Sequence, residues 1–149
     1  MLHLIELVTI TYDSVKKTVG KTGLILLHKL EDWKVSRGDI EFEDTEIGFN
    51  INLKTAKGSV TVLVFWGQRG QPTSQLMESR QNTYPAFANI ESEDKIQINH
   101  ELRNAYFQNT SGKEMNVKLE FAQLPADSVG PIINAIDGAV NIIKAKCET

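Results

Sequence analysis

The stretch from Glu46 to Trp66 has the clearest pattern in the chain, and the rest of the fold must accommodate it. Apolar residues alternate with glycine or asparagine as far as Leu53, and the alternation resumes at Val60 after the turn signal Lys57-Gly58. A period of two places alternate side chains on one face of a β-strand. A turn over residues 55–58 sets Leu53 opposite Val60. The same register pairs Ile51 with Val62, Phe49 with Val64 and Ile47 with Trp66.

The two ends of the chain have the spacing of helices. In residues 4–33, steps of three and four predict an amphipathic helix that breaks or bends between Gly20 and Gly23, and a strand over Val8–Thr11 is the alternative. A second stripe predicts a closing helix after Asp127 or Ser128, either of which can serve as the cap. The closing stripe consists of Val129, Ile133, Ile136, Val140, Ile143 and Cys147.

Further strands are predicted on both sides of the first hairpin. Asp39–Phe42 alternates, with its acidic residues pointing away from Ile40 and Phe42. Lys95–Gln108 and Met115–Leu124 alternate around a turn and predict a second hairpin. The sequence therefore predicts one α+β domain over residues 1–149. Its antiparallel sheet consists of two hairpins, about four to five strands, packed by the N-terminal and C-terminal helices.

Composition excludes several classes of function. Net charge is 16 − 19 = −3, so the chain lacks the basic footprint of a nucleic-acid-binding protein. Val62–Trp66 is the longest apolar run, which is too short to cross a membrane. Cys147 is the single cysteine, and an internal disulfide is therefore impossible. We expect a reducing, cytoplasmic environment.

Gly67–Asp94 is the least regular segment and the expected rim of any binding site. Its first half is polar and predicted to be mobile, and its second half has apolar anchors beginning at Tyr84. Arg69 and Arg80 are its arginines, and they would meet an anionic or planar polar partner. Trp66 ends the strand that leads into this loop, so it completes the candidate binding residues here.

Histidines are the other candidates for a site. His100 falls on the apolar face of its predicted strand, where it would be partly buried and a candidate binding residue. His28 precedes Asp32 by one helical turn, so the two side chains could share a ligand or a proton. The same spacing is common for an exposed pair that has no such role. The acidic segment from Asp39 lacks the glycine and final glutamate of a calcium loop. We predict no catalytic set of residues, no bound metal and no cofactor.

Three hypotheses for function follow. The first is a non-enzymatic protein-interaction or accessory module that binds a protein partner or associates with itself. The alternative is a small-molecule-binding protein with a pocket between sheet and helices, roofed by residues 67–94. The third is an enzyme that uses His100 or His28. Surplus apolar residues on the outer face of the first hairpin, Leu63 and Phe65, favour the first hypothesis unless a helix layer covers them.

Overall fold

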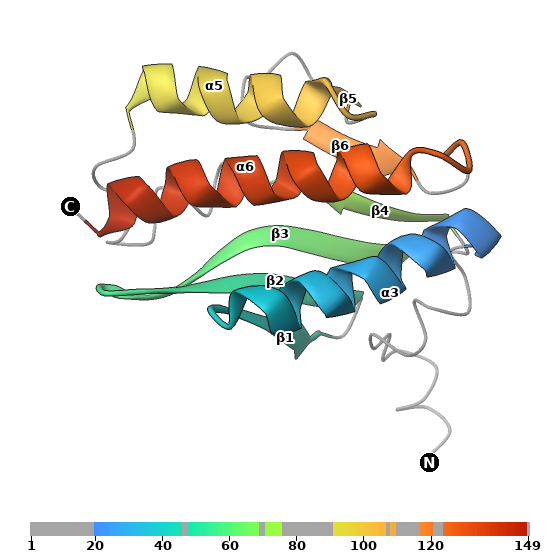
Figure 1. Cartoon of the computed structure of the whole chain (residues 1–149), viewed down its shortest axis with the longest axis horizontal. Coiled ribbons are helices and arrows are strands. Elements are labelled where there is room, and N and C mark those ends of the chain that lie inside the picture. The colour runs from blue at the N-terminus through green and yellow to red at the C-terminus, as the bar shows by residue number, and fades with distance from the viewer. Residues whose placement is uncertain are drawn as a thin grey trace.

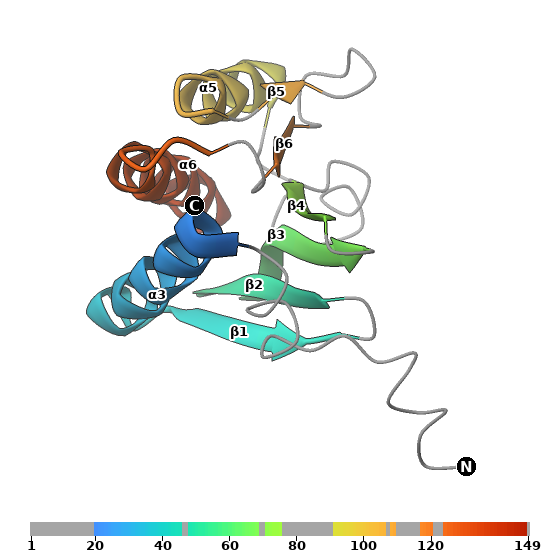
Figure 2. The ribbon, with the colours of Figure 1, turned by 90° about the vertical axis from the view of Figure 1, so that its right-hand side faces the viewer.

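The computed structural model describes residues 20–45, 48–68, 71–75, 91–106, 108–109, 117–120 and 124–148. They form an α+β structure in which the described helices lie on one face of an antiparallel sheet, as the side view in Figure 2 shows. The helices are α3 (Gly20–Arg37), α5 (Ser92–Arg103) and α6 (Val129–Cys147). The strands are β1 (Ile40–Asp44), β2 (Gly48–Thr55), β3 (Gly58–Gln68), β4 (Gln71–Gln75), β5 (Gln108–Asn109) and β6 (Val117–Glu120) (Figure 1).

The strands follow the order β1-β2-β3-β4-β6-β5, and each neighbouring pair is antiparallel. The prediction of an antiparallel sheet packed by helices is confirmed. The sheet has six strands within the described residues, where the sequence predicts about four to five. Part of the difference lies in residues 67–94, whose first half contributes β4 instead of remaining irregular. β4 pairs with the end of β3, with Pro72 opposite Gly67.

The first predicted hairpin is present as β2 and β3. Thr55 pairs with Gly58 and Leu53 with Val60, which confirms the predicted turn. The Thr55 hydroxyl donates to the Gly58 carbonyl at 2.7 Å, and the Lys57 amide donates to the Thr55 hydroxyl at 3.1 Å. Gly58 has a φ of +121°, a conformation that glycine adopts without the cost of a Cβ.

A β-bulge at Val62 changes the rest of the predicted register. Asn52 pairs with Thr61 and Ile51 with Leu63, so Val62 is the additional residue on β3. Beyond the bulge the predicted pairing of Phe49 with Val64 is wrong, because β3 has shifted by one residue. The observed partners beyond the bulge are Asn50 with Val64, Phe49 with Phe65, and Gly48 with Trp66.

The bulge explains the apolar residues that the predicted register places on the outer face of the hairpin. Leu63 and Phe65 belong to the buried core, and the Phe65 ring stacks on Phe49 with a centroid distance of 4.6 Å. Val62 is buried as well, and with Leu63 it lines the contact with α6. A helix layer therefore covers Leu63 and Phe65, and they form no exposed patch.

Two other predicted elements are confirmed in the part that the structure describes. In β1, Ile40 is buried while Glu41 and Glu43 are exposed, as the alternation predicts. In α3, the stripe through Gly23, Leu26, Leu30 and Trp33 is buried. The described helix runs from Gly20, whose φ is +76°, through Gly23 to Arg37, and the predicted break or bend stays a prediction because the N-terminal half of the predicted helix lies outside the described residues. Residues 1–19, with the alternative strand over 8–11, lie outside the described residues.

The first strand of the second predicted hairpin is wrong, because Ser92–Arg103 is helix α5. Ile98 and Leu102 are buried and lie four residues apart, a spacing that fits a helix and an alternating strand equally well. Two other features favour the helix. Ile96 is 52% exposed, and the Glu91 amide donates to the Asp94 carboxylate at 3.1 Å as part of a capping box.

The closing helix α6 begins and ends as predicted. Ser128 is its N-cap residue, and Val129 is its first residue. The Ser128 hydroxyl donates to the Pro125 carbonyl at 2.7 Å, so it ties the preceding turn to the helix instead of capping a helical amide. The predicted stripe is buried except at Ile133, which is partly exposed, while Ile132 is buried in its place. Ile133 is thereby free to take part in a surface feature.

Candidate functional site

Helices α3 and α6 lie side by side and run in the same direction, as the colour gradient in Figure 1 shows. Trp33 contacts Asp137 and Arg37 contacts Asn141, so a step of four residues along one helix matches a step of four along the other. The junction has two parts with different chemistry. Toward the C-terminus of α3 it is closed by a network of charged side chains, and toward its N-terminus it opens into an apolar groove.

Arg37 is the centre of the closed part, which we call the Arg37 network. Its guanidinium donates to both carboxylate oxygens of Asp39, through Nε at 2.9 Å and Nη2 at 3.1 Å. Nη1 donates to Asp137 Oδ1 and to Asn141 Oδ1, each at 2.7 Å. Such bidentate, charge-assisted bonds fix a planar guanidinium in one orientation. Because the Arg37 side chain is only 14% exposed, water competes weakly for these bonds.

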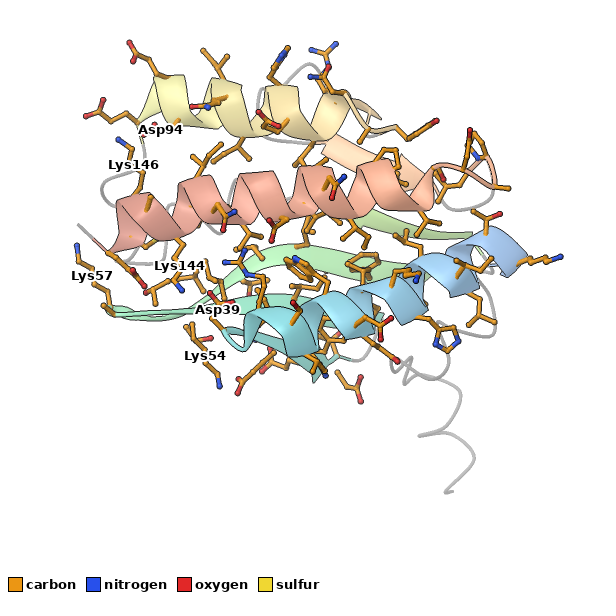
Figure 3. The ribbon with its side chains drawn as sticks, viewed as in Figure 1. Asp39, Lys54, Lys57, Asp94, Lys144 and Lys146 are labelled. Carbon is orange, nitrogen blue, oxygen red and sulfur yellow. The ribbon has the colours of Figure 1, made fainter. Side chains whose placement is uncertain are left out.

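Two more side chains complete the Arg37 network. Lys144 of α6 donates to Asp39 Oδ2 at 2.7 Å, and Figure 3 shows these two side chains pointing toward one another. The indole of Trp33 donates to Asp137 Oδ1 at 2.8 Å. The network therefore joins the end of α3, the residue before β1, and α6 from its middle to its last turn. It contains equal numbers of positive and negative groups, so it carries no surplus charge for an ionic ligand.

The pKa values of Arg37, Asp39 and Asp137 are displaced farther from neutrality than is usual for these residue types. The hydrogen bond from Arg37 is the main cause that lowers the pKa of Asp39 from 3.8 to about 2, against the opposing effect of burial. Burial alone would raise the pKa of Asp137, but hydrogen bonds from Trp33 and Arg37 outweigh it and lower that pKa. The hydrogen bond to Asp39 raises the pKa of Arg37. A general acid or base needs a pKa near the working pH, so this network suits a structural role.

The open part of the junction, the α3–α6 groove, has a volume of about 470 Å³ and is open to solvent. Trp33 lines the groove and is only 8% exposed, so it lies at the floor, and Ile25 is 43% exposed near the N-terminus of α3. Val129 and Ile133 line the groove from the first two turns of α6. The complete lining is Ile25, Lys29, Asp32, Trp33, Ser36, Val129, Gly130, Ile133 and Asn134.

Two opposite charges stand on the α3 side of this groove. Lys29 and Asp32 are exposed, and neither forms an ion pair or side-chain hydrogen bond with another described residue. They lie three residues apart on one helix face, close to one turn. The α3–α6 groove thus combines an apolar floor with one available positive and one available negative group.

One cavity between the sheet and the helices is lined by described residues, and it is small. A cavity lined by Val62, Leu102 and Ile136, among others, measures about 10 Å³. That is about the smallest space that can hold one water molecule. This cavity is therefore too small to be the predicted ligand pocket between sheet and helices. Its proposed roof falls largely on residues 76–90, which lie outside the described residues.

The structure leaves most of the predicted binding residues untested. Arg69, Arg80 and Tyr84 lie outside the described residues. Trp66 is placed by its backbone, which pairs with Gly48 and Thr73. These four residues remain predictions and are not part of the groove that the structure shows.

The prediction of a partly buried His100 is wrong. His100 is exposed in the last turn of α5, where Asn104 Nδ2 lies 3.3 Å from its Nε2. The burial was expected from the strand pattern, which does not apply to a helix. His28 is also exposed, and its Nδ1 lies 3.8 Å from Glu31 Oε2. Asp32 instead lines the α3–α6 groove.

The sequence reasoning missed this groove. Ile25 lies outside the predicted core stripe of α3, and the predicted core stripe of α6 includes Val129 and Ile133. One signal was present in the sequence. Ile132 and Ile133 are adjacent and point about 100° apart around the helix, so one of them can lie at the edge of the buried stripe.

Reactive and charged groups elsewhere in the described residues have structural roles. Burial raises the pKa of the Cys147 thiol, which disfavours the reactive thiolate. Lys146 lies 3.7 Å from Asp94 and links α6 to α5, a pair labelled in Figure 3. Within the described ranges, no cluster of three or more His, Cys, Asp or Glu side chains has the geometry to hold a metal ion.

Comparison of the chain with protein-family models, with curated proteins and with solved structures finds no match. None of the helices in the described part of the chain has the length and apolar character needed to span a membrane. Function must therefore be argued from the geometry of the α3–α6 groove and from the residues around it.

Proposed function

We propose that the protein is a non-enzymatic interaction module whose α3–α6 groove binds apolar side chains of a protein partner. The observation that carries this proposal is the open apolar groove of about 470 Å³ beside the exposed Ile25. Grooves between two helices that are lined by apolar residues commonly receive an amphipathic helix. Ile25 to Ser36 spans about 16 Å of helix, which matches about three turns of such a partner.

The shape of the groove favours a polypeptide over a small molecule. Pockets for small molecules usually enclose most of their ligand, whereas this groove is open to solvent. Lys29 and Asp32 on its rim suit the polar edge that surrounds the apolar centre of a protein interface. Trp33 on its floor is a residue type that often dominates binding energy at such interfaces.

Selection from a phage-displayed library of helix-forming peptides tests this proposal. The affinity of each enriched peptide would be measured by fluorescence anisotropy on the parent protein and two variants. We expect Ile25→Asp to weaken binding by roughly tenfold or more, because it places a charge beside the groove. Val35→Asp is the matched control, since Val35 is 77% exposed on the same helix and does not line the groove.

The control should change affinity by less than roughly twofold, since Val35 is outside the proposed contact. Enrichment of peptides that bind both variants as well as the parent would assign the binding to another surface. Failure to enrich any peptide would also overturn the proposal, because an apolar groove of this size should accept a suitable helix.

A further inference from the structure

The residues with which α3 lines the rim of the groove follow a helix-pairing pattern. Ile25, Lys29, Asp32 and Ser36 are separated by four, three and four residues. This is the alternating spacing by which a helix presents one seam to another helix. Trp33 and the α6 residues Val129 and Ile133 flank the seam with apolar surface.

This seam is complementary to itself when it is reversed. If two copies of α3 pair in antiparallel orientation about a point between Leu30 and Glu31, Lys29 of one copy faces Asp32 of the other. The same two-fold axis repeats this pair with the copies exchanged, and it sets Ile25 opposite Ser36. A two-fold interface requires this property, because the same surface patch must complement itself.

The two charges are available for such a contact. Lys29 and Asp32 are exposed, and within the described part of the chain neither has an ion pair or side-chain hydrogen bond. By contrast, the charged residues of the Arg37 network along the same helix junction are bound to one another. Among the described residues, Lys29 and Asp32 thus lie unpaired in the part of the junction that is also open and apolar.

We infer that the partner in the α3–α6 groove is a second copy of this chain, held as a two-fold dimer through antiparallel α3 helices. Two reciprocal Lys29–Asp32 ion pairs set the register. The Ile25 side chain of each copy lies over the Ser36 end of the other copy's groove, where Trp33 provides apolar surface. This inference rests on the proposed function, since it names the partner for the same groove.

Exchange of the two charges gives a test that loss of folding cannot imitate. Lys29→Asp leaves two negative residues on each seam, and Asp32→Lys leaves two positive ones. Each variant alone should dimerise roughly tenfold or more weakly than the parent, because like charges then face each other. An equimolar mixture of the two variants should recover a dimer, because every contact again joins opposite charges.

Sedimentation velocity of the full chain over a wide concentration range would measure these dissociation constants. Lys21→Asp is the matched control, since Lys21 is exposed on α3 and does not line the groove, and its dimer should resemble that of the parent. The inference fails if the parent is monomeric throughout the range. It also fails if the single variants dimerise as the parent does, or if the mixture does not recover a dimer.

These outcomes separate the inference from the proposed function. A monomeric parent whose groove binds selected peptides in an Ile25-dependent way would overturn the second copy as partner and leave the interaction module standing. A parent dimer that is insensitive to both charge variants would place self-association on another surface. A dimer restored only in the mixture supports the inference and the groove together.

Discussion

The two ends of the α3–α6 junction differ in how the side chains of the two helices contact each other. At one end the Arg37 guanidinium donates to Asp39 and to Asp137 at distances of 2.7 to 3.1 Å. At the other end Ile25 and Ile133 border an open groove, and Lys29 and Asp32 have no partner in the described residues. We infer that the closed end fixes the relative position of the helices. The open end is then free to use its side chains for a contact outside the chain.

The largest effect on stability is expected from Arg37→Ala. This change removes the donor shared by Asp39, Asp137 and Asn141, and it should lower the free energy of unfolding by about 3 kcal/mol. Urea-induced unfolding would measure it. The matched control is Lys54→Ala, which removes an ion pair to Glu41 whose two side chains are more than half exposed. The control should cost less than about 1 kcal/mol, since exposed ion pairs contribute little. Equal losses would show that the closed end has no special role.

Acid should weaken the closed end next. The pKa of Asp39 is about 2 in the folded protein, below the ordinary 3.8. The stabilisation by this carboxylate is therefore complete above pH 3.8 and is lost as the pH falls toward 2. We expect the parent to lose on the order of 2 kcal/mol more than Asp39→Asn between pH 4.5 and 2. Unfolding curves at several pH values would show this, and parallel losses in both proteins would contradict the assigned pKa.

A smaller loss is expected from Trp33→Phe. The substitution keeps an aromatic ring on the floor of the groove but removes the indole donor to Asp137. It should cost about 1 kcal/mol, the typical net contribution of one hydrogen bond. Thermal or urea unfolding measures the loss. If the variant loses several kcal/mol instead, the ring packs more tightly than an open groove permits, and the contrast between the two ends weakens.

The smallest effect on stability is expected from Ile25→Asp. Ile25 is 43% exposed and makes its proposed contact outside the chain, so the free energy of unfolding of the monomer should change by less than about 0.5 kcal/mol. Peptide binding and dimerisation should nevertheless be lost. This separation of stability from binding is the opposite of the pattern expected for Arg37→Ala. A destabilised Ile25→Asp monomer would mean that the residue belongs to the core.

Local pattern predicted the elements in which one periodicity fits every residue. The stripe of α6, the buried residues of α3 and the turn of the first hairpin are confirmed for this reason. The reading of residues 95–108 failed because Ile98 and Leu102 satisfy two periodicities at once. The polar His100 between them was then assigned to a buried face. The capping box at Glu91 and Asp94 was the local signal for a helix.

The groove could not be predicted from either helix alone. It exists because α3 and α6 contact each other at Trp33 and Asp137 but leave Ile25 and Ile133 partly open. That geometry depends on the long-range pairing of Arg37 and Asp39 with α6, between residues about a hundred positions apart. Periodicity reports which face of a helix is buried, and it contains no information on how far a neighbouring helix covers that face.

The bulge at Val62 has a consequence for changes in chain length. Because Val62 is the additional residue on β3, its deletion would turn the bulge into a regular ladder and leave every other pairing intact. Leu63 and Phe65 would still point into the core. Deletion of Val64 would also remove the bulge, since Val62 can then pair with Ile51 and Phe65 keeps its place opposite Phe49, but Leu63 would move to the opposite face of the sheet. Within β3, loss of one residue beyond the bulge therefore changes the face of only the side chains that lie between that residue and the bulge.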